Sequence, residues 1–317
     1  MINLKDIEEA RILIEDKIYK TPIITNEVIN SKTKNKVFLK LENLQKTGFF
    51  KIRGVFNKLS SLQSKVKGII CATSGSHGLA VAYACSFFGW KAKVIVPTNT
   101  PTFKINKLKE LSDVEIVGDS YHESYLYAIQ TSKKEGLTFI HGFDDPLVIA
   151  GQGTVGLEMA EEIEELDLMI VPVGGGGLLS GILIGIKSLH PRIKIIGVQA
   201  EGAASMYLSW KKGSIVELEQ VNTIAEGVAV KKPGELTFEI INKLVDDIVI
   251  VSDEDIKESM KILFYEAKVI AEGAGAISLA PLLCEKISVR NKKIGCIISG
   301  GNISGSSLCN LLQNFTS

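Results

Sequence analysis

The chain has 317 residues with 36 basic and 36 acidic side chains, so its formal net charge is zero. Hydrophobic residues make up 45% and charged residues 23% of the sequence, which is typical of a globular protein long enough to bury a large core. Because no block of basic residues stands out, the composition argues against nucleic acid and anionic membranes as partners.

Short runs rich in Val and Ile alternate with amphipathic segments of helical length along most of the chain. This alternation is typical of parallel sheets covered on both faces, so it predicts an α/β doubly wound fold. The expected strands are, in chain order, 68–72, 92–96, 114–117, 168–173, 194–198, 248–251 and 293–299. The expected helices are 77–88, 102–111, 157–165, 178–189, 253–268, 274–284 and a last one from Ser304 onward.

The segment 169–186 lacks charged residues and is as long as a membrane helix, but it contains Pro172 and a run of four glycines. A strand, a glycine loop and a helix start explain it better than a membrane span. The N-terminal segment 1–9 is charged, without the apolar core of a secretion signal, so we expect a cytoplasmic protein. The five cysteines lie widely spaced and mostly in apolar runs, which predicts buried free thiols.

Three unusual loops follow expected strands. They are the Thr-Ser-Gly-Ser-His segment 73–77, the four glycines 174–177 and the Ser-Gly-Gly-Asn segment 299–302. In open α/β sheets, ligands bind beyond the C-terminal ends of strands, where loops lead into helix N-termini. The sequence therefore predicts three strand–loop–helix sites suited to small polar or anionic ligands.

The glycine run 174–177 is the strongest local signal, because consecutive glycines let backbone N–H groups wrap an anion. A tight turn is the structural alternative, although such a turn rarely needs four glycines. A dinucleotide site is a second functional alternative. No G-x-G-x-x-G registers, since Ser180 holds the last position in one frame, but Glu201 at the end of the next strand keeps an acidic ribose-binding residue open.

Lys51 lies in the segment Thr-Gly-Phe-Phe-Lys-Ile-Arg-Gly, residues 47–54. A single lysine is usually a solvated side chain, but this segment resembles the cofactor-lysine motif of the threonine dehydratases and serine racemases. The resemblance is highly specific, because it continues in the family's order and spacing across almost the whole chain. The further matching blocks are 74–78, 150–156, 172–178, 223–227, 272–276 and 299–302.

The resemblance implies a fold-type-II pyridoxal-phosphate enzyme, similar in fold to the β subunit of tryptophan synthase. It has two doubly wound open-sheet lobes, the smaller inserted in the larger, with pyridoxal 5'-phosphate in the cleft between them. The large cofactor-binding lobe is expected at 1–60 and 147–317, and a small mobile lobe at 61–146. The family also implies a homodimer or homotetramer.

Site residues are implied by motif position. Lys51 would hold the cofactor as a Schiff base and remove the substrate's Cα proton. Phe50 would pack beside the cofactor ring, and Ser299 would face the pyridine nitrogen. The residues implied to bind the phosphate are Gly174, Gly175, Gly176, Gly177 and Leu178. The residues implied to hold the substrate carboxylate are Thr73, Ser74, Gly75, Ser76 and His77.

Ser299 also bears on the reaction type. A neutral hydroxyl opposite the ring nitrogen favours an unprotonated pyridine, which is a weaker electron sink than a protonated one. A long-lived carbanion is then disfavoured, and expulsion of a β-hydroxyl becomes the easy outcome. The residue therefore favours β-elimination over transamination.

Two residues depart from the family pattern. Phe49 replaces a serine and adds bulk near the substrate, and Ser76 replaces an asparagine that binds the cofactor's phenolic oxygen. Losing a hydrogen bond to a charged oxygen costs about 1.5–3 kcal/mol, part of which a serine recovers through water. These changes bear on activity and substrate choice. The family's divalent-cation site is not matched, since Gln199 and Ser205 stand where acids are expected, so we expect no metal.

The expected function is β-elimination of a hydroxy amino acid, L-threonine or L-serine, to 2-oxobutanoate or pyruvate plus ammonia. One alternative is a serine-type racemase, in which Ser74 acts as a second base opposite Lys51. Another is a binding protein with impaired catalysis, motivated by Phe49 and Ser76.

Overall fold

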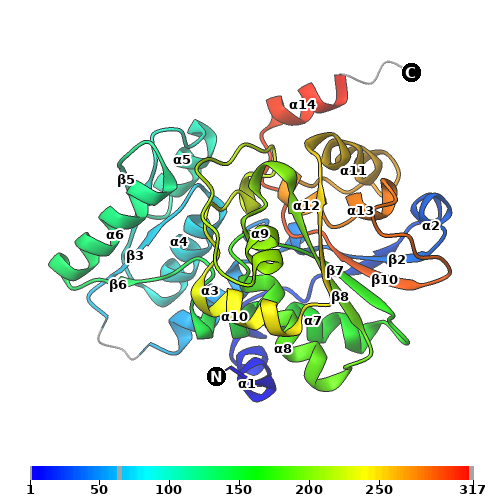
Figure 1. Ribbon diagram of the computed structural model, residues 1–317. Coiled ribbons are helices and arrows are strands. Elements are labelled where there is room, and N and C mark those ends of the chain that lie inside the picture. The colour runs from blue at the N-terminus through cyan, green and yellow to red at the C-terminus, as the bar shows by residue number, and fades with distance from the viewer. Residues whose placement is uncertain (1, 63–65, 314–317) are drawn as a thin grey trace.

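The computed structural model describes residues 2–62 and 66–313, and within them the chain forms two open sheets (Figure 1). The larger has six strands, in the order β1 (Ile23–Thr25), β2 (Lys36–Lys40), β10 (Lys293–Ile297), β7 (Leu168–Pro172), β8 (Lys194–Ala200) and β9 (Asp247–Val251). The smaller has four, in the order β5 (Asp113–Ile116), β4 (Ala92–Val96), β3 (Ile69–Ala72) and β6 (Thr138–Phe139). All neighbouring strands are parallel except the β1–β2 pair. This is the α/β architecture with two open sheets that the sequence predicts.

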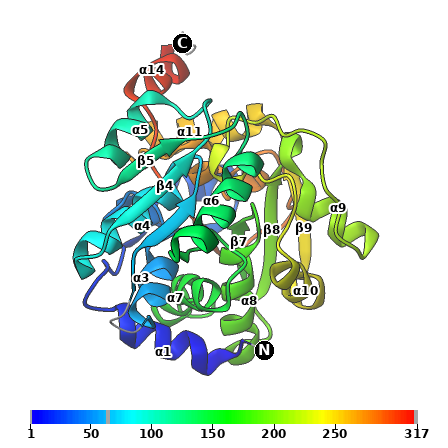
Figure 2. The ribbon, with the colours of Figure 1, turned by 90° about the vertical axis from the view of Figure 1, so that its left-hand side faces the viewer.

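Helices cover both faces of both sheets (Figures 1 and 2). One face of the six-stranded sheet packs against α7 (Pro146–Glu162) and α8 (Gly177–Leu189). The opposite face packs against α2 (Glu27–Thr33), α11 (Asp253–Tyr265), α12 (Gly273–Ala276) and α13 (Ala280–Leu283). The four-stranded sheet packs α3 (Ile52–Ser60) and α4 (Ser76–Phe88) on one face and α6 (Tyr121–Glu135) on the other.

The remaining elements lie around these layers. They are α1 (Leu4–Ile14), η1 (Glu42–Leu44), α5 (Thr102–Lys109), η2 (Glu201–Ala203), α9 (Ser205–Lys212), η3 (Glu226–Val228), α10 (Glu235–Leu244) and α14 (Gly305–Gln313). Helix α3 packs on the small sheet and also contacts α7, so it lies between the two layers. The four small-sheet strands all fall between residues 69 and 139, whereas the lobe boundaries at 60/61 and 146/147 stay a prediction.

Strand β7 shows why the central strands are apolar throughout. Leu168 and Ile170 contribute to the core on one side of the sheet, and Met169 and Val171 to the core on the other. All four are buried, so no position in the strand favours a polar side chain. The segment 169–186 is β7, the glycine loop and α8. None of the helices within residues 2–62 and 66–313 has the length and apolar character needed to cross a membrane.

The sequence missed or misplaced several elements. Strands β1, β2 and β6 were not expected, because β1 and β6 are very short and β2 carries a lysine at each end. Helix α7 begins at Pro146, eleven residues before the expected start, because the glycine-rich segment 151–156 obscures its helical periodicity. The expected single helix 274–284 is wrong: the chain forms α12 and α13, with Pro281 in the first turn of α13.

The cysteines are free, as expected, but not all are buried. Cys71, Cys85 and Cys296 are buried, whereas Cys284 is intermediate and Cys309 is exposed. The expectation of a buried thiol is therefore wrong for Cys309, which lies on α14, a helix without buried residues.

Helices α7 and α8 cross with their backbones in contact at two glycines. A Cβ added at Gly181 would lie 2.3 Å from the Ile149 carbonyl oxygen and 2.5 Å from the Gly153 amide nitrogen. Backbone atoms cannot move aside as a flexible side chain can. Close packing of these helices, and with it the position of the glycine loop that precedes α8, therefore requires glycine at position 181.

We predict that Gly181→Ala lowers the free energy of unfolding by about 1–3 kcal/mol, as overpacking does, although alanine favours the helix by about 1 kcal/mol. Urea denaturation measures the change. Gly185→Ala is the matched control in the same helix, because its added Cβ would meet only the side-chain atoms Leu157 Cδ2 at 3.3 Å and Ile7 Cδ1 at 3.4 Å. Equal destabilisation by both substitutions would contradict the backbone-crossing explanation.

Candidate active site

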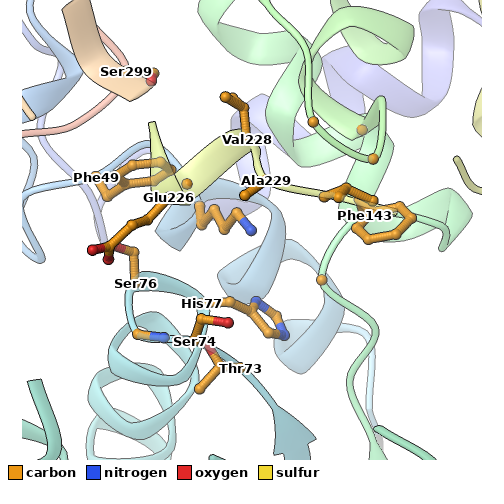
Figure 3. Close-up of a pocket in the computed structure, with 18 of the residues that line it drawn as sticks. Phe49, Thr73, Ser74, Ser76, His77, Phe143, Glu226, Val228, Ala229 and Ser299 are labelled. Carbon is orange, nitrogen blue, oxygen red and sulfur yellow. Dashed lines mark hydrogen bonds between the residues drawn. The ribbon is translucent and has the colours of Figure 1, made fainter. Parts of the chain in front are cut away.

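One pocket gathers every site residue expected from the sequence (Figure 3). It is lined from both sheets, by loops that follow β3, β7 and β10, together with the start of α3. The expected residues that line it are Phe50, Lys51, Thr73, Ser74, Gly75, Ser76, His77, Gly174, Gly175, Gly176, Gly177, Leu178 and Ser299.

A short turn that joins the large sheet to α3 places Lys51 in the pocket. Gly48 adopts a φ of +69°, Phe49 forms an antiparallel bridge with Gly300, and the Phe50 N–H donates to the Ser299 carbonyl at 3.1 Å. Lys51 is then the residue that immediately precedes α3. The lysine and the Ser299 loop are therefore fixed to each other by backbone contacts.

The pKa of the Lys51 amine is lower than that of an ordinary lysine. Burial lowers its pKa to about 8, against the opposing influence of the nearby Glu272 carboxylate. A substantial fraction of the amine is therefore neutral near physiological pH. A neutral amine can attack a carbonyl carbon or accept a proton, whereas an ordinary lysine stays charged.

Arg53 anchors the helix that follows the lysine. Its guanidinium donates to both Glu42 oxygens at 2.8 Å and to the two Glu158 oxygens at 2.6 and 2.9 Å. Lys40 Nζ lies 2.6 Å from Glu158 as well. Burial opposes ionisation of Glu158, but Arg53 and Lys40 lower its pKa overall. This buried network connects β2, η1 and α7 to the first turn of α3.

The glycine loop forms a concave cradle between β7 and α8. A Cβ added at Gly175 would lie 2.4 Å from the Phe143 ring, and Gly176 has a φ of +99° that side chains rarely adopt. The N–H groups of the first turn of α8 have no partner within the helix, and the helix dipole is positive at this end. The loop thus adopts a close-packed conformation that requires glycine and leads into a helix N-terminus, an arrangement that fits a phosphate.

The loop 73–77 is held by its own first residue. Thr73 Oγ1 accepts from the Gly75 N–H at 2.8 Å and from the Gly78 N–H at 3.2 Å. His77 Nε2 lies 3.1 Å from the Ile140 carbonyl, to which it donates. Burial, and secondly Lys51, lowers the His77 pKa to about 3, so the imidazole stays neutral. The loop therefore offers neutral donors beside a helix N-terminus, an arrangement suited to a carboxylate.

Ser299 lies at the end of β10 and is 1% exposed. Its hydroxyl donates to the Ala274 carbonyl at 2.9 Å. The hydroxyl must rotate about the Cβ–Oγ bond if it is to donate to a ring nitrogen. That rotation would exchange the bond to the Ala274 carbonyl for one to the ring nitrogen.

The two departures from the family pattern both lie at the pocket wall. Phe49 is 1% exposed, and its ring packs on Phe50 with centroids 4.9 Å apart. Ser76 is linked to Asn302, whose Nδ2 lies 3.3 Å from the serine Oγ. Phe49 is thus a lining residue of the pocket, and Asn302 supplies an amide next to the position where the family carries its own.

Several pocket residues lie outside the set of site residues that the sequence predicts. They are Lys104, Tyr121, Phe143, Gln152, Glu226, Val228, Ala229 and Glu272. Glu272 is the most notable, because burial raises its pKa to about 7, against the lowering influence of Lys104 and Lys51. In the sequence, only the resemblance of the block 272–276 to the family points to Glu272.

The part of the chain that the structure describes contains no cluster of three or more His, Cys, Asp or Glu side chains able to hold a metal ion. Gln199, at a position where the family's cation site has an acid, is buried and accepts from the Tyr207 N–H at 2.7 Å.

Comparisons with known proteins agree on one family. The family model described as pyridoxal-phosphate dependent enzyme matches residues 14–300. The chain is 44% identical over 306 residues to an L-threonine ammonia-lyase of Thermotoga maritima, which covers 96% of this chain and 76% of that protein. It is 43% identical over 307 residues to a catabolic L-threonine dehydratase of Escherichia coli, which covers 95% and 93% of the two chains.

Solved structures lead to the same group. The structure of maize serine racemase matches with a TM-score of 0.93 and 34% identity, covering 99% of this chain and 97% of that one. The processed form of threonine deaminase isoform 2 from Solanum lycopersicum matches with a TM-score of 0.92 and 36% identity, covering 98% of this chain and 86% of that one.

We predict that Arg53→Met lowers the free energy of unfolding by about 3–5 kcal/mol, because it leaves the Glu42 and Glu158 carboxylates buried without their main partner. Urea denaturation at neutral pH measures the loss. Arg11→Met is the matched control, since Arg11 pairs with Glu161 at the surface, where removing the pair costs less than about 1 kcal/mol. A loss below about 1 kcal/mol for Arg53→Met would contradict the anchoring role.

We predict that Glu272→Gln shifts the reactivity of Lys51 to lower pH. The carboxylate raises the Lys51 pKa, so its removal lets the amine deprotonate below the native value of about 8. The measurement is the pH dependence of Lys51 labelling by a small amine reagent in protein freed of pyridoxal phosphate, read by peptide mass mapping. Glu201→Gln, an acid outside the pocket, should leave the midpoint unchanged. An unchanged or raised midpoint in Glu272→Gln would refute the coupling.

Proposed function

Since the chain belongs to the pyridoxal-phosphate dependent enzymes, in the group of threonine dehydratases and serine racemases, we propose that it is an L-threonine ammonia-lyase that also accepts L-serine. The observation that carries this proposal is the 42–44% identity to threonine dehydratases over 95–96% of the chain. A pocket built around a buried lysine supports it.

The pocket residues fit the cofactor at several points. Lys51 offers its amine to the aldehyde, the cradle of Gly174, Gly175, Gly176, Gly177 and Leu178 offers N–H groups to the phosphate, and Ser299 offers a hydroxyl to the ring nitrogen. Phe50 lines the wall beside them. When bound, pyridoxal phosphate supplies an electron sink for the pair that the substrate's Cα releases.

Lys51 is the group that moves the proton. With cofactor and substrate in the pocket, the Lys51 amine would accept the Cα proton. Its pKa of about 8 suits this step, because the neutral base is present at neutral pH and the protonated form can give the proton back.

The loop 73–77 positions the substrate through its carboxylate. Backbone N–H groups and the side chains of Ser74 and Ser76 provide donors, and Thr73 fixes the loop shape. The neutral His77 contributes packing without a competing charge. Phe143, Val228 and Ala229 add apolar groups to the pocket lining, which suits the short side chain of threonine (Figure 3).

The overall reaction is balanced without an external reactant. The Cα–H and Cβ–O bonds break and a molecule of water leaves. The resulting enamine takes water back as it hydrolyses, which yields ammonia with 2-oxobutanoate from threonine or pyruvate from serine.

Racemisation is a second candidate activity, favoured by the similarity to maize serine racemase and by the position of Ser74 in the pocket. In this scheme Ser74 exchanges a proton with Cα on the face opposite Lys51. We also propose that the protein works in the cytoplasm as a homodimer or homotetramer, as the family resemblance implies.

We predict that the purified protein with pyridoxal phosphate releases 2-oxobutanoate from L-threonine, and that Lys51→Ala reduces the rate by at least about a hundredfold, as loss of a general base does. Coupled keto-acid assay measures the rate. Lys46→Ala is the matched control: Lys46 precedes the same turn but packs over the Tyr19 ring, outside the pocket.

Chiral analysis of the unreacted amino acid in the same assay separates the alternatives. D-serine formed from L-serine, and lost in Ser74→Ala, would establish the racemase activity. Absence of both keto acid and D-amino acid across L- and D-serine and threonine would refute the lyase and support a binding protein with impaired catalysis.

A further inference from the structure

An ion pair crosses between the two lobes at the wall of the pocket. Lys104 lies on α5, next to the four-stranded sheet. Glu226 lies on η3, in the segment of chain that connects β8 to β9 of the six-stranded sheet. Lys104 Nζ is 2.5 Å from Glu226 Oε2. The lysine side chain is 12% exposed and the glutamate side chain 55% exposed, so the pair faces the outside of the molecule on its glutamate side.

The lysine stem lies against the loop expected to hold the substrate carboxylate. A Cβ added at Gly75 would lie 2.7 Å from Lys104 Cδ, and Gly75 has a φ of +149°. Lys104 therefore covers Gly75 from outside.

A second cavity of about 760 Å³ lies on the other side of the pair. It is formed by α5, η3, α11, α12 and α14. Lys104, Glu226 and Glu272 line this outer cavity and the catalytic pocket alike. The Lys104–Glu226 pair is thus part of the partition between the two spaces.

We propose that the Lys104–Glu226 ion pair is a gate through which an α-amino acid passes from the outer cavity into the catalytic pocket. This proposal rests on the proposed function, which makes an amino acid the substrate. An amino acid is a zwitterion and brings one charge of each sign. While the ion pair is broken, the substrate carboxylate can interact with Lys104 and the substrate ammonium with Glu226. These interactions offset part of the free energy of breaking the pair, so the gate opens more easily in the presence of an amino acid than in water alone.

A gate changes the speed of passage in both directions without changing the affinity of the bound ligand. The test removes both charges together, in Lys104→Met/Glu226→Gln, so that neither is left unpaired. Stopped-flow mixing of holoenzyme with L-alanine, which lacks a leaving hydroxyl, follows the absorbance of the bound cofactor. We expect the association and dissociation rates both to rise about two- to fivefold, which corresponds to an ion pair worth about 0.4–1 kcal/mol, with Kd unchanged.

Three comparisons sharpen the result. The swapped variant Lys104→Glu/Glu226→Lys should return both rates to wild-type values, because it restores the pair. High salt should speed the wild type and not the neutral variant. Lys107→Met, on the same helix but outside both the pocket and the outer cavity, should leave the rates unchanged.

Each contrary outcome overturns a defined statement. Unchanged rates in the neutral variant would refute the gate. A raised Kd with an unchanged association rate would show that the pair holds bound substrate instead. No absorbance change with L-alanine or L-threonine in the wild type would refute amino-acid binding itself, and with it the proposed function.

Discussion

The structure depends on a group of four charges buried where β2, η1, α3 and α7 meet. Arg53 and Glu42 are completely buried, Lys40 is 0% exposed and Glu158 is 7% exposed. A single charge at such depth is costly, but two cations and two anions in mutual contact satisfy one another. Thr21 completes the set, because its carbonyl accepts from Lys40 and its hydroxyl donates to Glu42. Only one arrangement of β2, η1, α3 and α7 keeps all these partners together.

That constraint places Lys51, the lysine proposed to hold the cofactor. Lys51 stands two residues before Arg53, at the point where the chain enters α3. Helix α3 belongs to the core of the small sheet and also touches α7 of the large one. The amine is therefore held where loops from both sheets meet. The glycine cradle after β7 and Ser299 after β10 face it from one lobe, and the loop 73–77 faces it from the other.

Local patterns predicted most of this frame. Strand β4 was expected at 92–96 and occurs there, since its apolar run contacts helices on both faces. The three loops were recognised because glycine and small polar residues after an apolar strand have few other uses. Strand β2 was missed because the buried Lys40 reads as a surface residue until its distant partner Glu158 is known. Glu272, Lys104 and Glu226 were missed for the same reason: their roles arise from tertiary contacts alone.

The ionisable groups around Lys51 differ in pKa, because burial and neighbouring charges act on each of them to a different extent. His77 is neutral at all physiological pH values, because its pKa is about 3. Glu272 has a pKa of about 7 and Lys51 a pKa of about 8, and each favours the charged form of the other. Lys104 stabilises the Glu272 anion, whereas Glu226 destabilises it, so both members of the ion pair act on the acid that raises the Lys51 pKa.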